Sequence, residues 1–569
     1  MSPRLANRRI RLVLAGLALV LALTLGRAVW LQVIRAPALE RLAAQQHHEL
    51  VTTPASRGTI FDRLGVQLAI GEQATTVYAD PRQVRNAHRV AVQVGQALNI
   101  DPNKIYPQLL DKERSFVYIE RKADPARAAA LQRRGLAGLD FYPEERRSYP
   151  QHTVAAQVLG YAGVDNKGLA GLELGLERYL AGRPGKETIV RDPFGRTINV
   201  ISSTQEQPGR DVFLTLDHTL QAKVESVLRT TVARWHATDG TAIVLDPKTG
   251  GILAMAVALG FDANDFSRVP SGYQRNRAVT DTYEPGSTFK VVTYAAALSD
   301  RVVSPNSKFT LAPTIKVADR VIEEAEPRPT ETMSVAEMLA RSSNIGTITL
   351  AELVGRERLG RWISRFGFGS PTGIDFPGES PGIVLPVDRW SGSTIGNVPI
   401  GQGIAVTPLQ MAAAYGALAD NGVRIQPHLV DHVRGRKPKK LVRHRVVTPA
   451  VAQQLLGMLQ GVVSSQGGTG GEAAVPGYLV AGKTGTAAKP DSSGGYSDTN
   501  YVASFIGIVP ASTPRLVILV AINEPRGQIF GGLVAAPAFR DIARFALQYL
   551  DVPPDDLTSL RGAGGAPQH

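Results

Sequence analysis

The chain has 569 residues, of which 43% are apolar and 20% charged. At roughly 150 residues per domain it is long enough for two to four domains, and it can bury at least one large core. It contains no cysteine, which excludes disulfides, thiol nucleophiles and cysteine metal sites. Its 63 Lys and Arg against 50 Asp and Glu give a net charge of +13, so nucleic acid, anionic lipid and acidic polymers are all candidate partners.

The N-terminus predicts a membrane anchor. Four arginines precede residue 12, the first acidic residue is Glu40, and residues 12–34 are almost wholly apolar. This stretch exceeds the roughly 20 residues that a helix needs to span a bilayer. We therefore expect a cytoplasmic tail over residues 1–11, an anchor over residues 12–34, and the rest of the chain on the outer side of the membrane, because positive charge stays in the cytoplasm. Arg27 lies near the outer end, where its side chain can reach the headgroups.

A cleaved signal peptide is the alternative, because Ala36-Pro37-Ala38 resembles a small-x-small cleavage site. The apolar stretch is longer than the ~7–15 residues of a signal peptide's apolar region, and the proline is a poor context for cleavage. We favour the retained anchor, and with no second stretch of this kind we predict a single span.

Residues 51–205 are rich in Arg, Gly and Pro. Residues 57–65 have the pattern of a strand, a turn and a strand, and residues 168–173 lead into a short amphipathic helix. The segment contains no catalytic constellation, so it is interpreted as a scaffold or docking domain.

A second pattern covers residues 211–550. Asp217 or Thr219 can cap a helix whose apolar positions all lie on one face. We expect strands over residues 241–246, 251–256, 478–487, 501–509 and 515–523, a mostly helical stretch over 287–420, and a closing helix over 537–550. The strands thus come from both ends of the segment. The Pro- and Gly-rich residues 551–569 are expected to be a disordered tail.

A basic run over residues 434–445 raises the possibility of nucleic-acid binding. The favoured interpretation is a solvated hairpin with Pro438 near its bend. Because this part of the chain is expected outside the membrane, we predict no nucleic-acid partner.

Three short motifs occur in order. Ser287-Thr288-Phe289-Lys290 follows Glu284-Pro285-Gly286, Ser342-Ser343-Asn344 begins 55 residues after Ser287, and Lys483-Thr484-Gly485-Thr486 begins 196 residues after it. Each motif is weak alone, and the chain contains a second copy of two of them, Lys248-Thr249-Gly250 and Ser304-Pro305-Asn306. The first copy is expected at a hairpin tip and the second far from Ser287 along a helix, so both are interpreted as structural.

Ser287 is expected at the N-terminus of a helix, because Pro285-Gly286 interrupts the chain before it. Free N–H groups there favour developing negative charge. Lys290 lies one turn later on the same face and can take the serine proton if burial lowers its pKa. A capping serine with a surface lysine is the alternative for such a motif taken alone.

The other two motifs supply groups that can bind a peptide substrate and relay a proton. Ser342 can pass on a proton, and the amide of Asn344 can hold a substrate amide, although the same residues suit a helix–helix turn. Lys483 to Thr486 lie on a strand that can pair with an extended peptide, and Gly485 permits close approach of a substrate. Thr484 and Thr486 can bind a carboxylate beside the charge of Lys483, although a plain strand end is the simpler alternative.

Together the motifs resemble those of penicillin-binding proteins and serine β-lactamases, with Ser342-Ser343-Asn344 in place of Ser-Asp-Asn. Residues 57–65, 147–150 and 168–173 resemble the N-terminal motifs of class B penicillin-binding proteins, and 401–403 and 407–410 resemble their transpeptidase domain. The length, the Glu284-Pro285-Gly286 lead-in and the lack of an appended C-terminal domain favour the division-specific (septal) group of Gram-negative bacteria, the penicillin-binding protein 3 type. The elongation-specific group is the alternative. Val291 departs from the family, since many relatives have proline there.

The resemblance implies a fold and a set of roles. The fold is one transmembrane helix, a mixed α+β pedestal (dimerisation) domain over residues 51–205, and an α/β, serine β-lactamase-like transpeptidase domain over 211–550, with an antiparallel sheet flanked by helices and an all-helical subdomain. Ser287 is the nucleophile toward D-Ala-D-Ala, Lys290 the base, Ser342 the relay and Asn344 the group that orients the donor. Lys483, Thr484 and Thr486 bind the terminal carboxylate. The N–H groups of Ser287 and Thr486 form the oxyanion hole.

The implied function is D,D-transpeptidation of peptidoglycan stem peptides in septal wall synthesis, with no metal and no cofactor. β-Lactams are expected to acylate Ser287 and leave slowly, because the sequence offers no second base to activate water. A separate membrane glycan polymerase and other division proteins are the expected partners, and the inner membrane at the septum the expected location. The alternatives are a β-lactamase or β-lactam sensor on the same fold, and a division scaffold whose active site is secondary.

Overall fold

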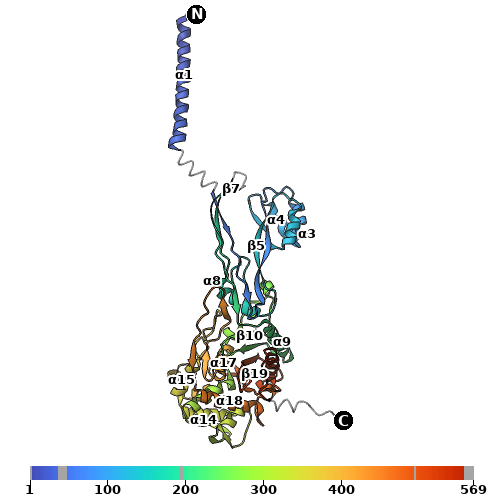
Figure 1. Cartoon of the computed structure of the whole chain (residues 1–569), viewed down its shortest axis with the longest axis vertical. Helices are drawn as coiled ribbons and strands as arrows, with labels where there is room; N and C mark the ends of the chain where they lie inside the picture. Colours follow the sequence, from blue (N-terminus) through green and yellow to red (C-terminus); the bar gives the residue numbers. More distant parts are fainter. Residues whose placement is uncertain (1–2, 36–47, 192–196, 492–494, 557–569) are drawn as a thin grey trace, which may run out of the picture. The chain divides into compact units, whose positions relative to one another are not determined.

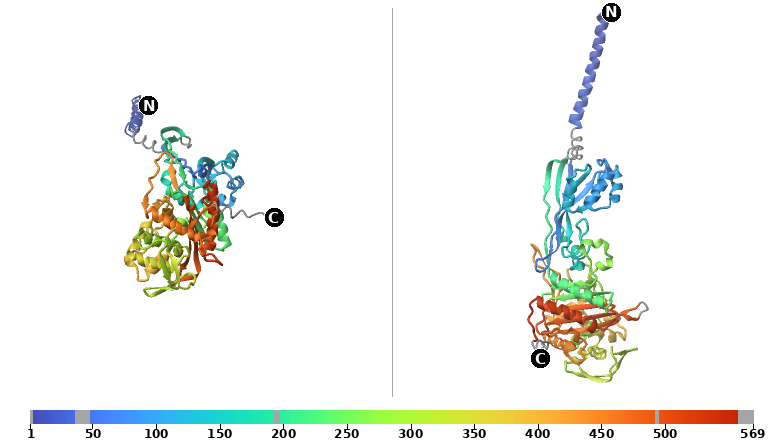
Figure 2. Two further views of the ribbon diagram at one scale, coloured as in Figure 1. Left: turned by 60° about the horizontal axis from the view of Figure 1, so that its bottom comes forward. Right: turned by 90° about the vertical axis from the view of Figure 1, so that its right-hand side faces the viewer.

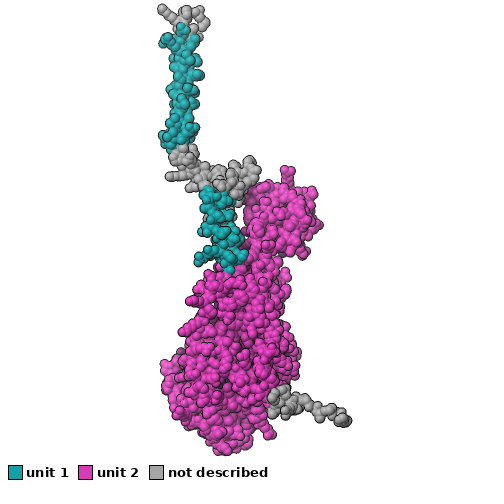
Figure 3. Space-filling model, in the orientation of Figure 1, with its two compact units in different colours: residues 1–56, 182–209 teal, residues 57–181, 210–569 magenta. Residues whose placement is uncertain are grey.

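The computed structural model describes residues 3–35, 48–191, 197–491 and 495–556 of the chain. These residues divide into two compact units. Unit 1 comprises residues 1–56 and 182–209, and unit 2 comprises residues 57–181 and 210–569 (Figure 3).

Unit 1 contains the apolar N-terminal helix. Helix α1 (Pro3–Val29) continues into a π-helical turn, η1 (Trp30–Ile34), and residues Ile10–Ile34 are long and apolar enough to cross a membrane. No other helix in the described ranges meets that test, in keeping with the expected single span. Residues 3–11, expected as a tail, belong to the same helix. The guanidinium groups of Arg27 and Arg35 lie 4.6 and 4.5 Å from the centre of the Trp30 ring, so Arg27 is positioned at the end of the span rather than at its middle.

Unit 1 also contains a three-stranded antiparallel sheet. Its strands are β1 (His48–Thr53), β6 (Gly185–Arg191) and β7 (Thr197–Thr204), in the order β1-β6-β7.

The first part of unit 2 is a sheet covered by helices. Strands β3 (Gln67–Ala79), β4 (Val117–Ala123) and β5 (Leu139–Ser148) form its antiparallel centre (Figure 1). Helices α3 (Ala87–Leu98), α4 (Pro102–Leu110) and α5 (Pro125–Gln132) share one apolar core with these strands. Each helix begins at a side-chain cap, Asn86, Asp101 or Asp124, which accepts a hydrogen bond from the first turn.

This sheet extends beyond the pedestal segment. Its full order is β16-β8-β2-β3-β4, with β5 also paired to β3. Strand β2 (Ile60–Phe61) runs parallel to β8 (Val212–Leu214), and β8 pairs with β16 (Val430–Val433). The expected boundary between residues 205 and 211 therefore crosses a continuous sheet.

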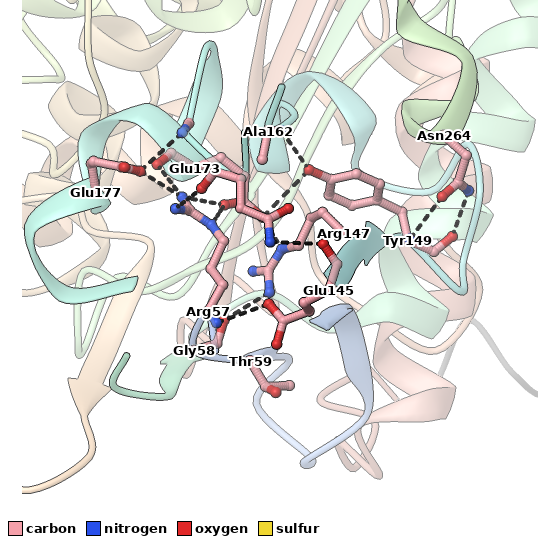
Figure 4. Close-up of polar contacts among 12 residues, drawn as sticks. Arg57, Gly58, Thr59, Glu145, Arg147, Tyr149, Ala162, Glu173, Glu177 and Asn264 are labelled. Carbon is pink, nitrogen blue, oxygen red and sulfur yellow. Dashed lines mark hydrogen bonds and ion pairs between the residues drawn. The ribbon is translucent and has the colours of Figure 1, made fainter. Parts of the chain in front are cut away.

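A buried polar network joins three segments that are far apart in sequence (Figure 4). Glu173 accepts from Arg57 Nε (2.7 Å) and from Arg147 Nε (2.6 Å), and all three side chains are at most 2% exposed. Tyr149 completes the link: its OH accepts from Ala162 N (2.8 Å), and its backbone N donates to Asn264 Oδ1 (2.9 Å). Arg57 and Arg147 thus share the carboxylate of Glu173 on α7 (Gly171–Gly175), and Arg57 also pairs with Glu177 (2.8 Å) on α8 (Glu177–Leu180). Helix α6 (Ala156–Leu159) precedes them.

The second part of unit 2 is built on a five-stranded antiparallel sheet with the order β10-β9-β20-β19-β18, which is visible with its helices in Figure 2. Side chains alternate between two cores: Ile243 and Leu245 of β9 point into one, Ala242 and Val244 into the other. Because both faces of the sheet are buried, the sequences of its strands are nearly continuous apolar runs. The strands are β9 (Asp239–Leu245), β10 (Ile252–Val257), β18 (Ala481–Pro490), β19 (Tyr496–Val509) and β20 (Leu516–Asn523).

Helices cover both faces of this sheet. Helices α9 (His218–Arg234) and α20 (Ala536–Tyr549) share one core with it, and α12 (Lys290–Ser299), α17 (Pro408–Ala419) and α18 (Pro449–Ser464) share the other. Asp217 is the cap of α9, since it accepts from Thr219 N and Leu220 N. Thr407 and Gln410 form a capping box at α17. Short helical segments complete this part: η2 (Ala263–Arg268), α10 (Ser271–Gln274), α11 (Arg277–Thr280), η6 (Gly471–Ala473) and α19 (Gly531–Val534).

The stretch expected to be mostly helical also contains strands. Between α12 and α13 (Val335–Ala340) lie two small two-stranded sheets, so the all-helical description holds only from α13 to α17. Their strands are β11 (Lys308–Leu311), β12 (Thr314–Val317), β13 (Arg320–Glu323) and β14 (Glu331–Ser334). The helices that follow are α14 (Asn344–Val354), α15 (Arg356–Phe366), η4 (Val387–Arg389), α16 (Thr394–Asn397) and η5 (Val398–Ile400).

Two further expectations are modified. The basic run is not a hairpin, because β16 pairs with β8 while β17 (Arg443–Arg445) pairs with β15 (Val423–Ile425) in another sheet. Residues 551–556 are held on the domain, where Asp555 accepts from Leu479 N (2.8 Å). The rest of the expected disordered tail, residues 557–569, lies outside the described residues.

Candidate active site

The third motif lies on β18, the edge strand of the five-stranded sheet. The side chain of Lys483 is fully buried, and its Nζ donates to Ser342 Oγ (2.9 Å) and to Thr484 Oγ1 (3.2 Å). Thr484 also shares a hydrogen bond with Thr469 (2.8 Å). Thr486, two residues on, accepts through Oγ1 from Gly531 N (3.2 Å). Both threonine hydroxyls are therefore held in place on one face of the strand.

The first motif begins in a tight turn rather than directly in an α-helix. Residues Gly286–Phe289 form a 3₁₀ turn, η3, and α12 starts at Lys290. Gly286 has a φ of +53°, which an L side chain rarely adopts, and a Cβ at this position would lie 3.1 Å from Thr486 O. The turn that carries Ser287 is thus pressed against β18, and Ser287 itself is half-buried.

Gly485 is required by close packing within the protein, which the sequence did not indicate. A Cβ here would come within 2.3 Å of Ser504 Oγ and 3.0 Å of Pro285 O. The close approach at this position is therefore between β18, its neighbour β19 and the turn before Ser287. Gly401 packs similarly, since its Cβ would lie 2.1 Å from Gly286 O.

Lys290 is fully buried and directed at the second motif. Its Nζ donates to Ser342 O (2.6 Å), to Asn344 Oδ1 (2.8 Å) and to Ser342 Oγ (3.3 Å). Burial lowers the pKa of Lys290 to about 7, with Glu324 opposing and Arg328 reinforcing that shift. Burial and the charge of Lys290 also hold the pKa of Lys483 well below its usual value.

The second motif connects two helices through a strained residue. Ser342 follows α13 with a φ of +56°, in the left-handed region, and Asn344 opens α14. Backbone conformations of this kind persist where the surroundings fix them. Here Ser342 N donates to Leu339 O (3.1 Å), and Ser342 Oγ accepts from both Lys290 and Lys483.

Glu324 is hydrogen-bonded to this loop and was not identified from the sequence. Its carboxylate accepts from Ser343 Oγ and from Asn344 N (2.6 Å), and it is the acidic group whose charge acts on Lys290. Glu324 lies in a polar stretch after β13, without a motif, so no sequence signal distinguished it from Glu323 or Glu326.

Glu284 is a second residue whose contacts at the site were not predicted; the sequence placed it only in the segment before Ser287. It accepts from Gly403 N (3.0 Å) and from Tyr496 OH (3.2 Å), and burial raises its pKa. It therefore ties the segment 401–403 and strand β19 to the turn that carries Ser287.

The structure thus brings four of the expected catalytic residues, Lys290, Ser342, Asn344 and Lys483, into one hydrogen-bonded cluster with Thr484. Ser287, Gly485 and Thr486 lie on the adjoining turn and strand; in the described part of the chain, the Ser287 hydroxyl has no hydrogen bond to the cluster. The duplicate motifs lie elsewhere: Lys248 to Gly250 form the tip between β9 and β10, and Ser304 lies in the loop after α12. The described ranges hold no group of three or more His, Asp or Glu side chains arranged to bind a metal.

Comparison with known families agrees with this geometry. A model of the penicillin binding protein transpeptidase domain matches residues 240–544, and a model of the penicillin-binding protein dimerisation domain matches residues 52–214. The chain belongs to the class B penicillin-binding proteins. The resemblance inferred from the motifs is confirmed, and this class B protein is a serine-type transpeptidase rather than a lactamase of the same superfamily.

Individual relatives of this penicillin-binding protein cover nearly its whole length. The peptidoglycan D,D-transpeptidase FtsI of Escherichia coli K12 is 34% identical over 97% of this chain and 93% of its own. Stage V sporulation protein D of Bacillus subtilis is 35% identical over 93% of this chain and 83% of its own. The crystal structure of penicillin binding protein 3 from Mycobacterium tuberculosis with aztreonam superposes with a TM-score of 0.72 at 31% identity, covering 89% of this chain and 98% of that one.

Proposed function

We propose that this transpeptidase cross-links peptidoglycan stem peptides during septum formation, through an acyl-enzyme on Ser287. The observation that carries the proposal is the meeting of two buried lysines on one hydroxyl: Nζ of Lys483 and Nζ of Lys290 lie 2.9 and 3.3 Å from Ser342 Oγ. Burying two amines without a carboxylate in contact with either is costly, and such sites are typical of catalysis rather than of structure.

The acylation step follows from these positions. Lys290, with a pKa near 7, is neutral in half or more of the molecules at neutral pH and can take the proton of Ser287 Oγ as it attacks the D-Ala-D-Ala carbonyl. Oxyanion charge develops beside the backbone N–H groups of Ser287 and Thr486. The C–N bond then breaks, and the proton reaches the nitrogen of the departing D-Ala by way of Ser342.

The other residues position the donor and complete the cycle. Asn344 orients the donor peptide, while Lys483, Thr484 and Thr486 hold its terminal carboxylate, whose negative charge raises the pKa of Lys483 when it arrives. An amine from a neighbouring stem attacks the ester. A new amide forms, the surplus proton of the amine leaves through the same groups, and Ser287 Oγ regains its proton.

A β-lactam acylates Ser287 by the same step, because its strained amide occupies the place of the D-Ala-D-Ala bond. We expect slow release, since the carboxylate nearest to Ser287 in sequence, Glu284, already accepts from Gly403 N and Tyr496 OH. Activation of water by this group would require it to give up those contacts.

Location and partners extend the proposal. The basic N-terminus stays in the cytoplasm, the single span anchors the chain in the inner membrane, and the rest lies in the periplasm at the septum. A separate membrane glycan polymerase and other division proteins act with it. A fluorescent fusion tests the septal role: mid-cell signal is expected, and signal along the lateral wall would favour the elongation-specific alternative.

Labelling with a fluorescent penicillin tests the chemistry. We expect a stable adduct on Ser287 of the wild type, located by mass spectrometry, and none on Ser287→Ala. Lys483→Ala and Ser342→Ala should label far more slowly, whereas Lys248→Ala and Ser304→Ala, the matched changes in the duplicate motifs, should label normally. Folded wild type without an adduct, or a Ser287→Ala chain that restores septation in depleted cells, would favour the scaffold alternative.

A further inference from the structure

A groove of about 590 Å³ lies beside β16 and shares no residue with the catalytic cluster. We call it the basic groove. Helix α8 forms one wall of the groove and the basic run forms the other. The residues that line it include Arg178, Tyr179, His428, Arg436, Lys437 and Lys439. Residues of the basic run therefore line one wall of a cavity.

The cations of the basic groove are not neutralised by the protein. In the parts of the chain that the structure covers, Arg178, Arg436, Lys437 and Lys439 are exposed and none forms an ion pair with a carboxylate. Arg434, the neighbouring arginine of the same run, differs because it pairs with Asp211 (3.0 Å). Four like charges around one cavity repel each other, and an anionic ligand would relieve that repulsion.

The two carboxylates that line the basic groove are already engaged. Asp375 accepts from Leu429 N (2.7 Å) and Val430 N (2.9 Å), and Asp431 is bonded to His432 Nδ1 (2.7 Å). They are therefore held at the wall instead of crossing the cavity to the four cations.

The wall of the basic groove is also arranged to hold carboxylates in defined positions. The guanidinium groups of Arg178 and Arg436 lie 4.6 and 5.3 Å from the centre of the Tyr179 ring, so both are held at the same aromatic side chain. Planar guanidinium groups match carboxylates in two-point contacts. His428 Nδ1, also at the wall, is buried and has no partner among the described residues.

The size of the cavity distinguishes between anionic ligands. A volume of this order suits a ligand of a few residues. A folded protein partner instead needs an interface above about 1,000 Å². A stem peptide is short, ends in a free carboxylate and carries further carboxylates on its acidic residues.

We propose that the basic groove is a second binding site for peptidoglycan stem peptides, which holds a strand of the wall while the catalytic cluster acts on another stem. The proposal rests on the proposed function for the identity of the polymer. Its physical basis is independent of Ser287: four cations and His428 Nδ1 surround one cavity, and within the described ranges the cations form no ion pair and Nδ1 no hydrogen bond.

The test uses the full-length chain in detergent, acylated first with benzylpenicillin so that Ser287 is blocked. Fluorescence anisotropy then measures binding of a labelled N-acetylmuramyl tetrapeptide with free carboxylates. We expect saturable binding that weakens with salt, at least tenfold weaker binding of the same probe with amidated carboxylates, and at least tenfold weaker binding by Arg436→Ala/Lys437→Ala. The matched control is Lys316→Ala/Arg361→Ala, which removes two exposed cations of unit 2 that also have no ion-pair partner among the residues the structure describes.

Absence of saturable binding, equal binding of the amidated probe, or unchanged binding by the Arg436→Ala/Lys437→Ala chain would overturn the proposal. Tighter binding of a glutamate-rich peptide than of the stem peptide would overturn it in favour of a protein partner. Benzylpenicillin adducts on Ser287 report separately on the proposed function, and they also show that each variant is folded. The amidated probe requires no substitution, so it decides the question even if the double variant fails to fold.

Discussion

Unit 2 contains two buried clusters of charged residues that behave in opposite ways. In the network around Glu173, a carboxylate lies between two guanidinium groups at 2.6–2.7 Å, so every charge has a partner (Figure 4). In the catalytic cluster, Lys290 and Lys483 share a neutral hydroxyl, and no carboxylate contacts either amine among the described residues. The first arrangement holds segments together, whereas the second leaves the pKa of both lysines lowered, as the proposed proton transfer requires.

The largest effect that separates the two clusters is expected for Lys290→Met. Loss of the base should slow acylation by penicillin by roughly 10²–10⁴-fold. The same change should raise the thermal midpoint by at least about 2 °C, because an amine is no longer desolvated in the core. Stopped-flow acylation and calorimetry measure both. A variant that loses stability together with activity would show that Lys290 is mainly structural.

Glu173→Gln should have the opposite pattern. Removing the charge leaves the buried Arg147 without a counterion among the described residues and Arg57 with only Glu177, which costs about 3–5 kcal/mol in the free energy of unfolding. Acylation of the folded fraction should keep its wild-type rate. Glu177→Gln is the matched control, since Glu177 contacts the same Arg57 but its side chain is 30% exposed, and it should cost much less. Equal losses for the two variants would contradict the distinction between them.

Glu324→Gln should produce the smallest effect and the most specific one. Acylation needs neutral Lys290, so the wild-type rate should rise with pH through about 7. Burial and the charge of Arg328 lower the pKa of Lys290, while Glu324 opposes them by favouring its charged form. Removing the carboxylate charge should lower the pKa of Lys290 and move the rise in rate to lower pH.

The control for this change is Glu326→Gln, an exposed residue of the same stretch, which should leave the pH profile in place. A profile that moves to higher pH in Glu324→Gln, or moves equally in both variants, would rule out Glu324 as the group that tunes Lys290.

The apolar N-terminal helix, the strand pattern and the residues that gather around Ser342 Oγ could be predicted from the sequence alone. These features depend on local signals: a long apolar run, the distribution of apolar side chains along each strand, and short motifs. The motif Ser287 to Lys290, for example, lies directly after the turn-forming Pro285 and Gly286. Their order along the chain was enough to indicate the family, which the comparisons confirmed.

The remaining features could not be predicted from the sequence, because they depend on contacts between segments far apart in the chain. Glu324 reaches the Ser343–Asn344 backbone, and Gly485 is small because Pro285 and Ser504 approach it. Strand β16, just before the basic run, and β17, at its end, pair with strands of two different sheets instead of with each other, and residues of the run line a groove. Burial, which lowers the pKa of Lys290 and Lys483, is likewise a property of the assembled core, so the motifs located the two lysines while the fold shifted their pKa.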